Sequence, residues 1–354
     1  MNKKVLLVTG SSGLVGSETA CLLHEDYDLV YGIDNNQRKI FFGKSGDISK
    51  RKKEVITNIK NYHHLNIDIR DKKKIFDVFK KIKPKHIVHC AGQPSHDLAA
   101  QIPFEDFNIN ALGTLNLLEA TRIYTPKSIF IFLSTNKVYG DGPNDIKIKE
   151  LKSRYIFSEK KYKSGIAEDF KLDQCTHSLF GVSKLSADIM VQEYGRYFNI
   201  YSCILRAGCI TGHNHSGVEL HGFLNYLVKA NLERKKYKIY GYKGKQVRDN
   251  IHSIDLVNFI KYYLAKPRFA EVYNIGGGLE NTISVIEAIK LVSNLSGIEM
   301  NYEYINKPRI GDHICYYSNL SKIKSHFPKW KIRLKTSNIL AEIIKNNKQK
   351  KTWQ

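Results

Sequence analysis

The sequence predicts an α/β protein built on a doubly wound parallel sheet, because apolar strand-like runs alternate with helical patterns between residues 5 and 206. Continuous apolar runs are typical of strands that are covered on both faces. We expect such strands at 5–8, 28–33, 64–69, 85–89, 128–133 and 201–206. We expect helices between them, at 14–23, 72–81, 107–122 and 180–198. Sheets of this kind bind ligands beyond the carboxyl ends of their strands.

The remaining segments have weaker patterns. Residues 35–60 predict a loop with a short helix, and residues 141–176 are polar and irregular. After residue 206 the alternation stops, and helices are expected only near 223–232 and 283–296. This organisation predicts a cofactor-binding domain over 1–206 plus roughly 247–278. A smaller, substrate-binding region is then expected over 207–246 and 279–354.

The charge balance favours an anionic partner. The chain has 354 residues and a formal net charge of +22, and a basic protein attracts polyanions. The lysines are scattered, however, and we find no zinc-finger spacing, aromatic RNA-binding signature or basic-region heptads. We therefore expect a small diphosphate ligand and no nucleic acid.

The cysteines and the hydropathy favour a protein of the cytoplasm. Six cysteines without a C-x-x-C pair predict free thiols in a reducing compartment. The apolar run after the basic start has four residues, which is too short for a signal peptide. No stretch approaches the roughly 18 apolar residues of a membrane span, so we expect no membrane association.

A glycine-rich turn follows the first strand and opens the first helix. It reads Thr9-Gly10-Ser11-Ser12-Gly13-Leu14-Val15-Gly16. Glycines at such a turn let the backbone approach a pyrophosphate, and the helix start offers free N–H groups and a positive dipole. The turn therefore predicts a dinucleotide site.

The end of the second strand predicts which dinucleotide is bound. Asp34 follows Gly16 by 18 residues, and a carboxylate at this place can accept from both hydroxyls of a ribose. It would repel a 2′-phosphate, so NAD is favoured over NADP. Arg38 keeps NADP as an alternative. Asp68 and Ile69 follow the third strand, where an adenine edge would lie, and Asn110 interrupts a helix, which indicates a packing or ligand role.

Together these features resemble the extended short-chain dehydrogenase/reductases, the NAD-dependent epimerase/dehydratase family. The resemblance spans nearly the whole chain. The stretches that carry it are Thr9–Gly16, Asp34, Asp68-Ile69, His89–Gly92, Asn110–Thr114, Ser134–Gly140, Phe180–Lys184, Gln246–Asp249 and Asn274–Gly278. It implies a Rossmann domain with a smaller C-terminal nucleotide-sugar-binding domain.

Within this family the chain is most similar to the CDP-paratose (CDP-tyvelose) 2-epimerases. The residues that carry this likeness are Ser134–Asp141, Gly244–Asp249 and Gly92-Gln93. The resemblance implies that NAD⁺ takes a hydride from carbon 2 of a CDP-sugar and returns it to the other face of a 2-keto intermediate. It implies a place in carbohydrate biosynthesis, and we expect a homodimer or homotetramer.

The family's catalytic set is Ser or Thr, Tyr and Lys. Thr135 and Lys184 match the first and third members, whereas Phe180 occupies the position of the Tyr. Residues four apart share a helix face, so the geometry is kept while the acid/base group is absent. We expect His96, oriented by Asp97, to act as the substitute base, because histidine titrates near neutrality. His177 and Lys184 itself are alternatives.

The resemblance also implies two sets of binding residues. For NAD they are Gly10, Ser12, Gly13, Leu14, Val15, Gly16, Asp34, Asn35, Asp68, Ile69, Ala91, Gly92, Gln93, Asn110, Ser134, Lys184 and Ala207. For the nucleotide sugar they are Gln93, Thr135, Asn136, Arg248 and Arg309. The two arginines match pyrophosphate-facing positions, and a guanidinium fork suits a diphosphate.

Other functions remain open. The protein could be a 4-epimerase, or an oxidase or reductase of a nucleotide sugar; a 4,6-dehydratase is disfavoured because Asn136-Lys137 replaces the expected Asp-Glu. The loss of the Tyr is also consistent with a non-catalytic NAD-binding sensor. We expect no metal, because His213, His215 and His221 lack a carboxylate or thiol at ligand spacing, and no nucleophilic role for Cys175 or Cys209.

Overall fold

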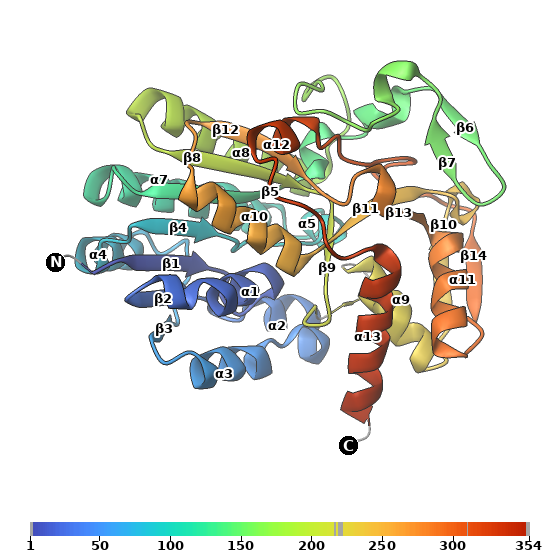
Figure 1. Cartoon of the computed structure of the whole chain (residues 1–354), viewed down its shortest axis with the longest axis horizontal. Helices are drawn as coiled ribbons and strands as arrows, with labels where there is room; N and C mark the ends of the chain where they lie inside the picture. The colour runs from blue at the N-terminus through green and yellow to red at the C-terminus, as the bar shows by residue number, and fades with distance from the viewer. Residues whose placement is uncertain (1–2, 216, 219–221, 310, 352–354) are drawn as a thin grey trace. The chain divides into compact units, whose positions relative to one another are not determined.

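The structure is a computed structural model that describes residues 3–215, 217–218, 222–309 and 311–351 (Figure 1). The chain forms two compact units. The first unit consists of Met1–Val138, Leu179–Arg206 and Leu256–Tyr273. The second unit consists of Tyr139–Ser178, Ala207–Asp255 and Asn274–Gln354.

A seven-stranded sheet forms the centre of the first unit (Figure 1). Its strands, in spatial order, are β12 (Glu271–Ile275), β8 (Ser202–Ala207), β5 (Ile129–Thr135), β4 (His86–His89), β1 (Val5–Thr9), β2 (Leu29–Ile33) and β3 (Tyr62–Leu65). The run from β5 through β4, β1 and β2 to β3 is parallel throughout. The order reverses at β1, as in a doubly wound sheet, so the predicted fold class is confirmed.

Helices cover both faces of this sheet. On one face α4 (Lys72–Ile82), α7 (Gly113–Tyr124) and α8 (Ser178–Phe198) contribute to a core that includes Phe79, Leu117 and Val191. On the other face lie α1 (Leu14–Leu23) and α10 (Ser253–Ala265), and Phe259 of α10 contacts Tyr273 of β12 edge to face. Strands β1 and β4 are buried along their whole length, which explains the continuous apolar run Val5–Val8 of β1.

Some elements of the first unit differ from the prediction. The third strand ends at Leu65 instead of continuing to 69, and Ile69 packs into the core beyond it. The segment 35–60, predicted as a loop with a short helix, contains two helices, α2 (Gln37–Phe42) and α3 (Ser49–Asn58). Only Val55 of α3 is buried, so its lysine-rich sequence shows little helical periodicity.

The helix predicted over 107–122 is interrupted. A short helix, α6 (Pro103–Phe107), leads into a π-helical turn over Asn108–Leu112 before α7 begins. Such turns are rare and are frequently found at functional sites. The turn carries Asn110, whose side chain is buried. Before α6 lies one turn of helix, α5 (His96–Ala99).

The described residues of the second unit form three small sheets, whose strands were not predicted from the sequence. An antiparallel hairpin joins β6 (Ile148–Glu150) and β7 (Tyr155–Phe157), and a parallel pair joins β10 (Tyr237–Tyr240) and β14 (Tyr302–Ile305). The third sheet has the order β13 (Thr282–Ser284), β11 (Val247–His252) and β9 (Cys209–Thr211). Each strand is short, so no periodic pattern develops along it.

Helices of the second unit share a separate core. It includes side chains of α9 (Phe223–Leu232), α11 (Val285–Ser296) and α13 (Thr336–Lys351). The predicted helix at 223–232 is confirmed, and the one at 283–296 begins at Val285 because Ser284 and Glu287 form a capping box. The C-terminal region also includes α12 (Ser321–His326), and Trp330 donates from Nε1 to the Asp255 carbonyl at 3.0 Å.

The boundaries of the two units differ from the predicted domains. Residues 139–178, 247–255 and 274–278 belong to the second unit, whereas the prediction assigned them to the cofactor-binding domain. The reason is pairing: β11 forms a sheet with β9 and β13, and the segment around Ile166 bridges to Ser318. Sequence order could not reveal these long-range contacts.

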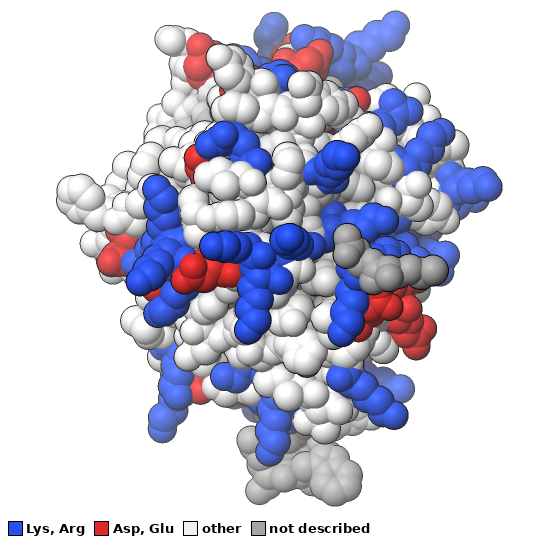
Figure 2. Space-filling view, turned by 90° about the vertical axis from the view of Figure 1, so that its left-hand side faces the viewer, with Lys and Arg blue, Asp and Glu red and all other residues white. Residues whose placement is uncertain are grey.

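Positively charged side chains are distributed over the surface shown in Figure 2 and do not form a single patch there. Figure 2 shows lysines and arginines spread over one face of the molecule, with carboxylates among them and uncharged surface between. Among the residues that the structure describes, no helix is both long enough and apolar enough to cross a membrane.

A buried ion pair joins α8 to β8 in the first unit. Arg206 donates from Nε and Nη2 to both oxygens of Asp188, at 3.1 and 3.0 Å, and both side chains are at most 2% exposed. Asp188 also accepts from Ser134 Oγ at 2.6 Å. The pair therefore ties α8 to two strands of the sheet.

We predict that Asp188→Ala lowers the free energy of unfolding by about 3–5 kcal/mol, because it removes the carboxylate that pairs with a buried guanidinium. Urea unfolding followed by circular dichroism measures this loss. The control is Arg196→Ala, which removes the exposed pair with Glu193 on the same helix and should cost less than about 1 kcal/mol. Equal losses for the two variants would contradict the importance of the buried pair.

Candidate active site

The glycine turn after β1 leaves room for a phosphate group. Gly10 has a φ of 65°, and a Cβ on Gly16 would lie 2.2 Å from the Gly10 carbonyl oxygen. Gly13 is the N-cap of α1, and no side chain caps this helix start. The Ser12 hydroxyl is buried and has no hydrogen-bond partner among the described residues. Uncapped N–H groups, an orphaned hydroxyl and a helix start fit the pyrophosphate of NAD.

Asp34 lies beside this turn, as predicted. One carboxylate oxygen accepts from the Ser12 N–H at 3.0 Å, and the other accepts from the Asn36 N–H at 2.8 Å. The carboxylate is therefore held at the carboxyl end of β2, where it can face a ribose. Burial lowers the pKa of Arg38, although nearby Asp34 opposes this shift.

Two of the predicted cofactor-binding residues, Asn35 and Asp68, are hydrogen-bonded to each other. Asn35 donates from Nδ2 to Asp68 at 3.0 Å, and Arg70 holds the same carboxylate with Nε and Nη2 at 3.0 and 2.7 Å. Ile69 is 5% exposed and packs in the core, so its side chain supports the sheet. The structure thus groups Asp34, Asn35 and Asp68 along the ends of neighbouring strands.

A buried polar network fixes the loop after β4. Asn110 accepts from the Gln93 N–H at 2.9 Å and donates to Asp106 at 3.0 Å and to Ser183 Oγ at 3.1 Å. Asp106 also accepts from Gln93 Nε2 at 2.8 Å and from Ser183 Oγ at 2.5 Å. Asn110 therefore holds the loop in place through its packing and hydrogen bonds, and this explains the π-helical turn.

The same network limits the predicted role of Gln93. Its side chain is 1% exposed, and its amide nitrogen also donates to the Ser95 carbonyl at 2.7 Å. The neighbouring Gly92 must lack a side chain, because a Cβ there would lie 2.8 Å from Asn110 Oδ1. Gln93 thus shapes the loop, and the backbone at Gly92 is the part of it that can approach a ligand.

Lys184 reaches from α8 to the end of β5. Its Nζ donates to the Leu133 carbonyl at 2.8 Å and lies 4.1 Å from the centre of the Phe132 ring. Thr135 ends the same strand two residues after Leu133, and its Oγ1 accepts from the Lys137 N–H at 3.2 Å. Thr135 and Lys184 are therefore held at one strand end, as the family likeness requires.

Burial is the largest cause of the pKa shifts of the ionisable groups around Lys184. Desolvation lowers the pKa of Lys184 to about 8, while Asp188, Cys90 and Asp106 favour its charged form. Desolvation raises the pKa of Cys90 to about 12. Desolvation also raises the pKa of Asp106, against the hydrogen bonds from Ser183 and Gln93 and the charge of Lys184. The ammonium of Lys184 can thus exchange a proton close to neutral pH.

Phe180 begins the turn of α8 that precedes Lys184. It is 8% exposed, and its carbonyl accepts from Ser183 Oγ at 3.1 Å. A phenyl ring neither donates nor accepts a proton, so the structure keeps the helix face and lacks the acid/base group. Other predicted residues of this corner are Ser134, which donates to Asp188, and Asn136, whose Oδ1 accepts from Thr135 Oγ1 at 3.4 Å.

The proposed substitute base follows the β4 loop. His96 begins α5, its Nδ1 lies 3.4 Å from Asp97, and 14% of its side chain is exposed. The loops after β4 and β5 leave the same edge of the sheet, because these strands are parallel neighbours. His177 lies in the second unit, where its ring contacts Cys175.

The predicted diphosphate arginines lie in the second unit. Arg248 forms an ion pair with Asp312 at 2.7 Å. Burial acts to lower the pKa of Arg248, but Asp312 and other neighbouring groups outweigh this effect, so the pKa is raised above its ordinary value. Arg309 is half-buried and precedes Asp312 by three residues. Arg248 is 13% exposed, so a bound diphosphate would compete with Asp312 for its guanidinium.

The remaining predicted positions are placed as follows. Leu14 and Val15 begin α1, and Ala91 donates from its N–H to Thr9 Oγ1 at 3.2 Å. Ala207 is buried at the end of β8. Cys175 and Cys209 are half-buried thiols, and His221 lies outside the described residues.

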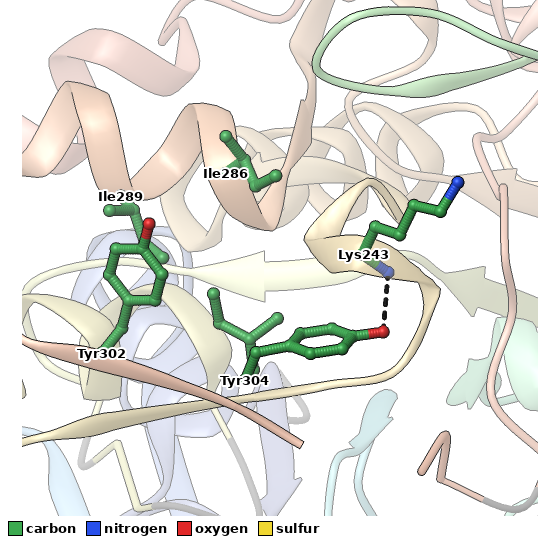
Figure 3. Close-up of a pocket in the computed structure, with 6 residues that line it drawn as sticks. Lys243, Ile286, Ile289, Tyr302 and Tyr304 are labelled. Atoms are coloured by element: carbon green, nitrogen blue, oxygen red, sulfur yellow. Dashed lines mark hydrogen bonds between the residues drawn. The ribbon is translucent and has the colours of Figure 1, made fainter. Parts of the chain in front are cut away.

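An apolar pocket lies elsewhere in the second unit. Its volume is about 330 Å³, and it is lined by Ile239, Lys243, Ile286, Ile289, Tyr302 and Tyr304. Figure 3 shows the two tyrosines on β14 and the two labelled isoleucines on α11, with the Lys243 N–H donating to Tyr304 Oη at 3.3 Å. None of the predicted cofactor or catalytic residues lines this pocket.

Three residues that support the positions of Lys184 and the loop after β4 were not predicted from the sequence. Asp106, Ser183 and Asp188 were not singled out, although each is fully or almost fully buried. Two signals were available: Asp106 precedes Asn110 by four residues, and Ser183 adjoins Lys184. Both spacings predict a shared face or a direct contact, but they do not identify the partners across the fold.

Comparisons with known proteins agree with this geometry. The model of a family described as the NAD dependent epimerase/dehydratase family matches residues 6–276. The CDP-paratose 2-epimerase of Salmonella typhi is 32% identical over 329 residues, which cover 90% of this chain and 92% of that protein. The human UDP-glucose 4-epimerase is 26% identical and covers 91% of this chain and 90% of its own length.

Solved structures share the fold. One is a Tyr-to-Phe mutant of the UDP-glucuronic acid 4-epimerase of Bacillus cereus, in complex with a UDP-sugar and NAD, with a TM-score of 0.79 and 24% identity over 98% of this chain and 99% of that one. Another is the dTDP-glucose 4,6-dehydratase of Bacillus anthracis in complex with NAD, with a TM-score of 0.77 and 24% identity over 99% and 98% of the two chains. This chain therefore belongs to the NAD-dependent epimerase/dehydratase family.

Proposed function

We propose that the protein is an NAD-dependent epimerase that inverts carbon 2 of a CDP-sugar through a 2-keto intermediate. The observation that carries the proposal is the position of Lys184, which is buried against the end of the strand that carries Thr135. The 32% identity to a CDP-paratose 2-epimerase supports the choice of carbon 2 and of CDP. Bound NAD supplies the group that accepts and returns a hydride.

The residues of this chain then have distinct tasks. Thr135 holds the reacting hydroxyl, and Lys184 holds the nicotinamide ribose and supplies positive charge. A hydroxyl that becomes a carbonyl must also lose its proton, and Phe180 cannot take it. We assign that proton to His96, whose Nδ1 lies 3.4 Å from Asp97, because a neighbouring carboxylate can orient an imidazole.

The two units divide the binding work in this proposal. The first unit binds NAD through the glycine turn and Asp34. The second unit binds the diphosphate through Arg248 and Arg309, and no nucleic acid is bound. Six free cysteines are consistent with a cytoplasmic protein. We further propose a homodimer or homotetramer, because α7 and α8 expose the apolar residues Ile123, Val182, Ile189 and Tyr197.

Two other functions have support. The 26% identity to UDP-glucose 4-epimerases favours the same redox cycle at carbon 4. Phe180 favours a non-catalytic protein that binds NAD and a nucleotide sugar as a sensor. Both alternatives use the same cofactor site, so they are separated by products and not by NAD binding.

We predict that the purified protein retains NAD, because a closed redox cycle consumes none. Denaturation should release close to one NAD(H) per chain, measured by chromatography of the supernatant. Asp34→Ala should weaken NAD binding by about 10–100-fold, the effect of losing a hydrogen bond to a charged group. The control is Asp28→Ala, an exposed aspartate before the same strand. Release of NADP would contradict the assignment of Asp34.

We predict that Arg248→Ala and Arg309→Ala each weaken CDP-sugar binding by roughly 2–5 kcal/mol, because each removes a charge-assisted diphosphate contact. Calorimetric titration of the NAD-loaded protein measures this change. Asp312→Asn keeps the Arg248 guanidinium and removes its competing carboxylate, so its affinity should be equal or higher. Tight, salt-sensitive DNA or RNA binding that these variants do not alter would overturn the diphosphate assignment.

We predict that His96→Ala lowers turnover by roughly 10²–10⁴-fold, the usual contribution of a positioned base, while NAD and CDP binding remain. The assay incubates the NAD-loaded protein with CDP-, UDP-, GDP- and dTDP-sugars and identifies products by NMR. The wild type should convert a CDP-sugar. Unimpaired His96→Ala would move the base to His177 or Lys184.

The variant Phe180→Tyr separates enzyme from sensor in the same assay. The new phenol would lie on the helix face of Lys184, whose charge would lower its pKa. If only this variant forms product, the natural protein is a sensor and the proposed epimerase activity is wrong.

A further inference from the structure

Three metal-binding side chains from distant segments meet in the second unit. His213 follows β9, His252 is the last residue of β11, and Glu342 lies on α13. Nδ1 of His213 contacts one carboxylate oxygen of Glu342, and Nε2 of His252 lies 3.2 Å from the other. One ligand atom from each of the three residues lies within 4.8 Å of the other two.

We propose that this cluster binds a divalent metal ion of the Zn²⁺ type. Two imidazole nitrogens and one carboxylate oxygen form a donor set that Zn²⁺ accepts, with a fourth position for water. His252 is 1% exposed and provides a rigid ligand, while the side chains of His213 and Glu342 are each 29% exposed and can adjust. Their exposure also leaves the fourth position open to solvent.

The backbone approaches the cluster closely at one glycine. The residue before His213 is Gly212, and a Cβ there would lie 2.8 Å from Ser253 Oγ and 3.2 Å from His252 Nε2. Ser253 Oγ is buried and has no hydrogen-bond partner among the described residues. A buried polar atom normally has a partner, which can be ordered water or an ion. It therefore points independently to a ligand beside His252.

Metal binding would change the hydrogen bond that His252 makes through its other ring nitrogen, Nδ1. Its Nδ1 accepts from the Ile254 N–H at 3.1 Å, so the ring proton lies on Nε2, which is 3.2 Å from the Glu342 carboxylate. A metal ion at Nε2 requires this single ring proton to move to Nδ1, and the contact with the Ile254 N–H then opens. The Ile254 hydrogen bond and the contact of His213 with Glu342 are then exchanged for three metal–ligand bonds.

A metal here would fasten the C-terminal helix to the sheet of the second unit. Helix α13 places Ile339, Leu340, Ile343 and Ile344 in the core of this unit, and Glu342 is its contact with His252 on β11. The ion has no part in the proposed hydride cycle. The sequence alone did not indicate this site, because the carboxylate lies 129 residues after His213.

The test titrates the full-length protein with Co²⁺ and Zn²⁺. Co²⁺ bound by nitrogen and oxygen ligands has weak visible bands and no thiolate charge-transfer band, which distinguishes this site from the six free cysteines. We expect one such ion per chain, and a higher Tm with Zn²⁺. His213→Ala and Glu342→Gln should each weaken binding at least tenfold and remove the gain in Tm.

The control variant is His63→Ala, which removes an exposed histidine of β3 in the first unit. It should bind Co²⁺ as the wild type does. A Co²⁺ spectrum dominated by thiolate charge transfer, or binding that His213→Ala and Glu342→Gln leave unchanged, would overturn the proposal. So would a lack of binding, because the three residues would then form only a hydrogen-bonded contact. Each readout is independent of epimerase activity.

Discussion

The burial of the Lys184 ammonium is the constraint on which the candidate active site depends. A charged group removed from water must find oxygen partners. Lys184 finds the Leu133 carbonyl at 2.8 Å and is stabilised by Asp188 and Asp106 nearby. These partners join α8 to the end of β5. Thr135 is therefore held close to Lys184 by the same interactions that make the buried charge tolerable.

The supporting polar network extends this constraint to the loop after β4. Asp106 accepts hydrogen bonds from Gln93, Asn110 and Ser183, and each of these groups is buried. An unsatisfied buried polar group is costly, so the network specifies one arrangement of the loop. The family's Tyr is missing from this arrangement, but the elements that would position it are complete.

The sequence predicted the features that are local in the chain. The glycine turn, Asp34 and the pairing of Phe180 with Lys184 follow from strand-turn-helix order and helical spacing. It predicted one short helix between residues 35 and 60, where the structure has α2 and α3, and it did not predict the short strands β9, β11 and β13. Those elements are stabilised by partners far away in sequence, as are the Arg248–Asp312 pair and the contact of His213 with Glu342. No periodicity along the chain encodes such partners.

The central claim is that Lys184 and Thr135 support a hydride cycle at carbon 2 without a phenol. The most direct measurement supplies the NAD-loaded protein with a CDP-sugar that carries deuterium at carbon 2 and analyses the product by NMR and mass spectrometry. The claim predicts an inverted product that retains deuterium at carbon 2, and no such product from a folded Lys184→Met variant. Deuterium lost to solvent, an inverted carbon other than carbon 2, or equal turnover by Lys184→Met would contradict it.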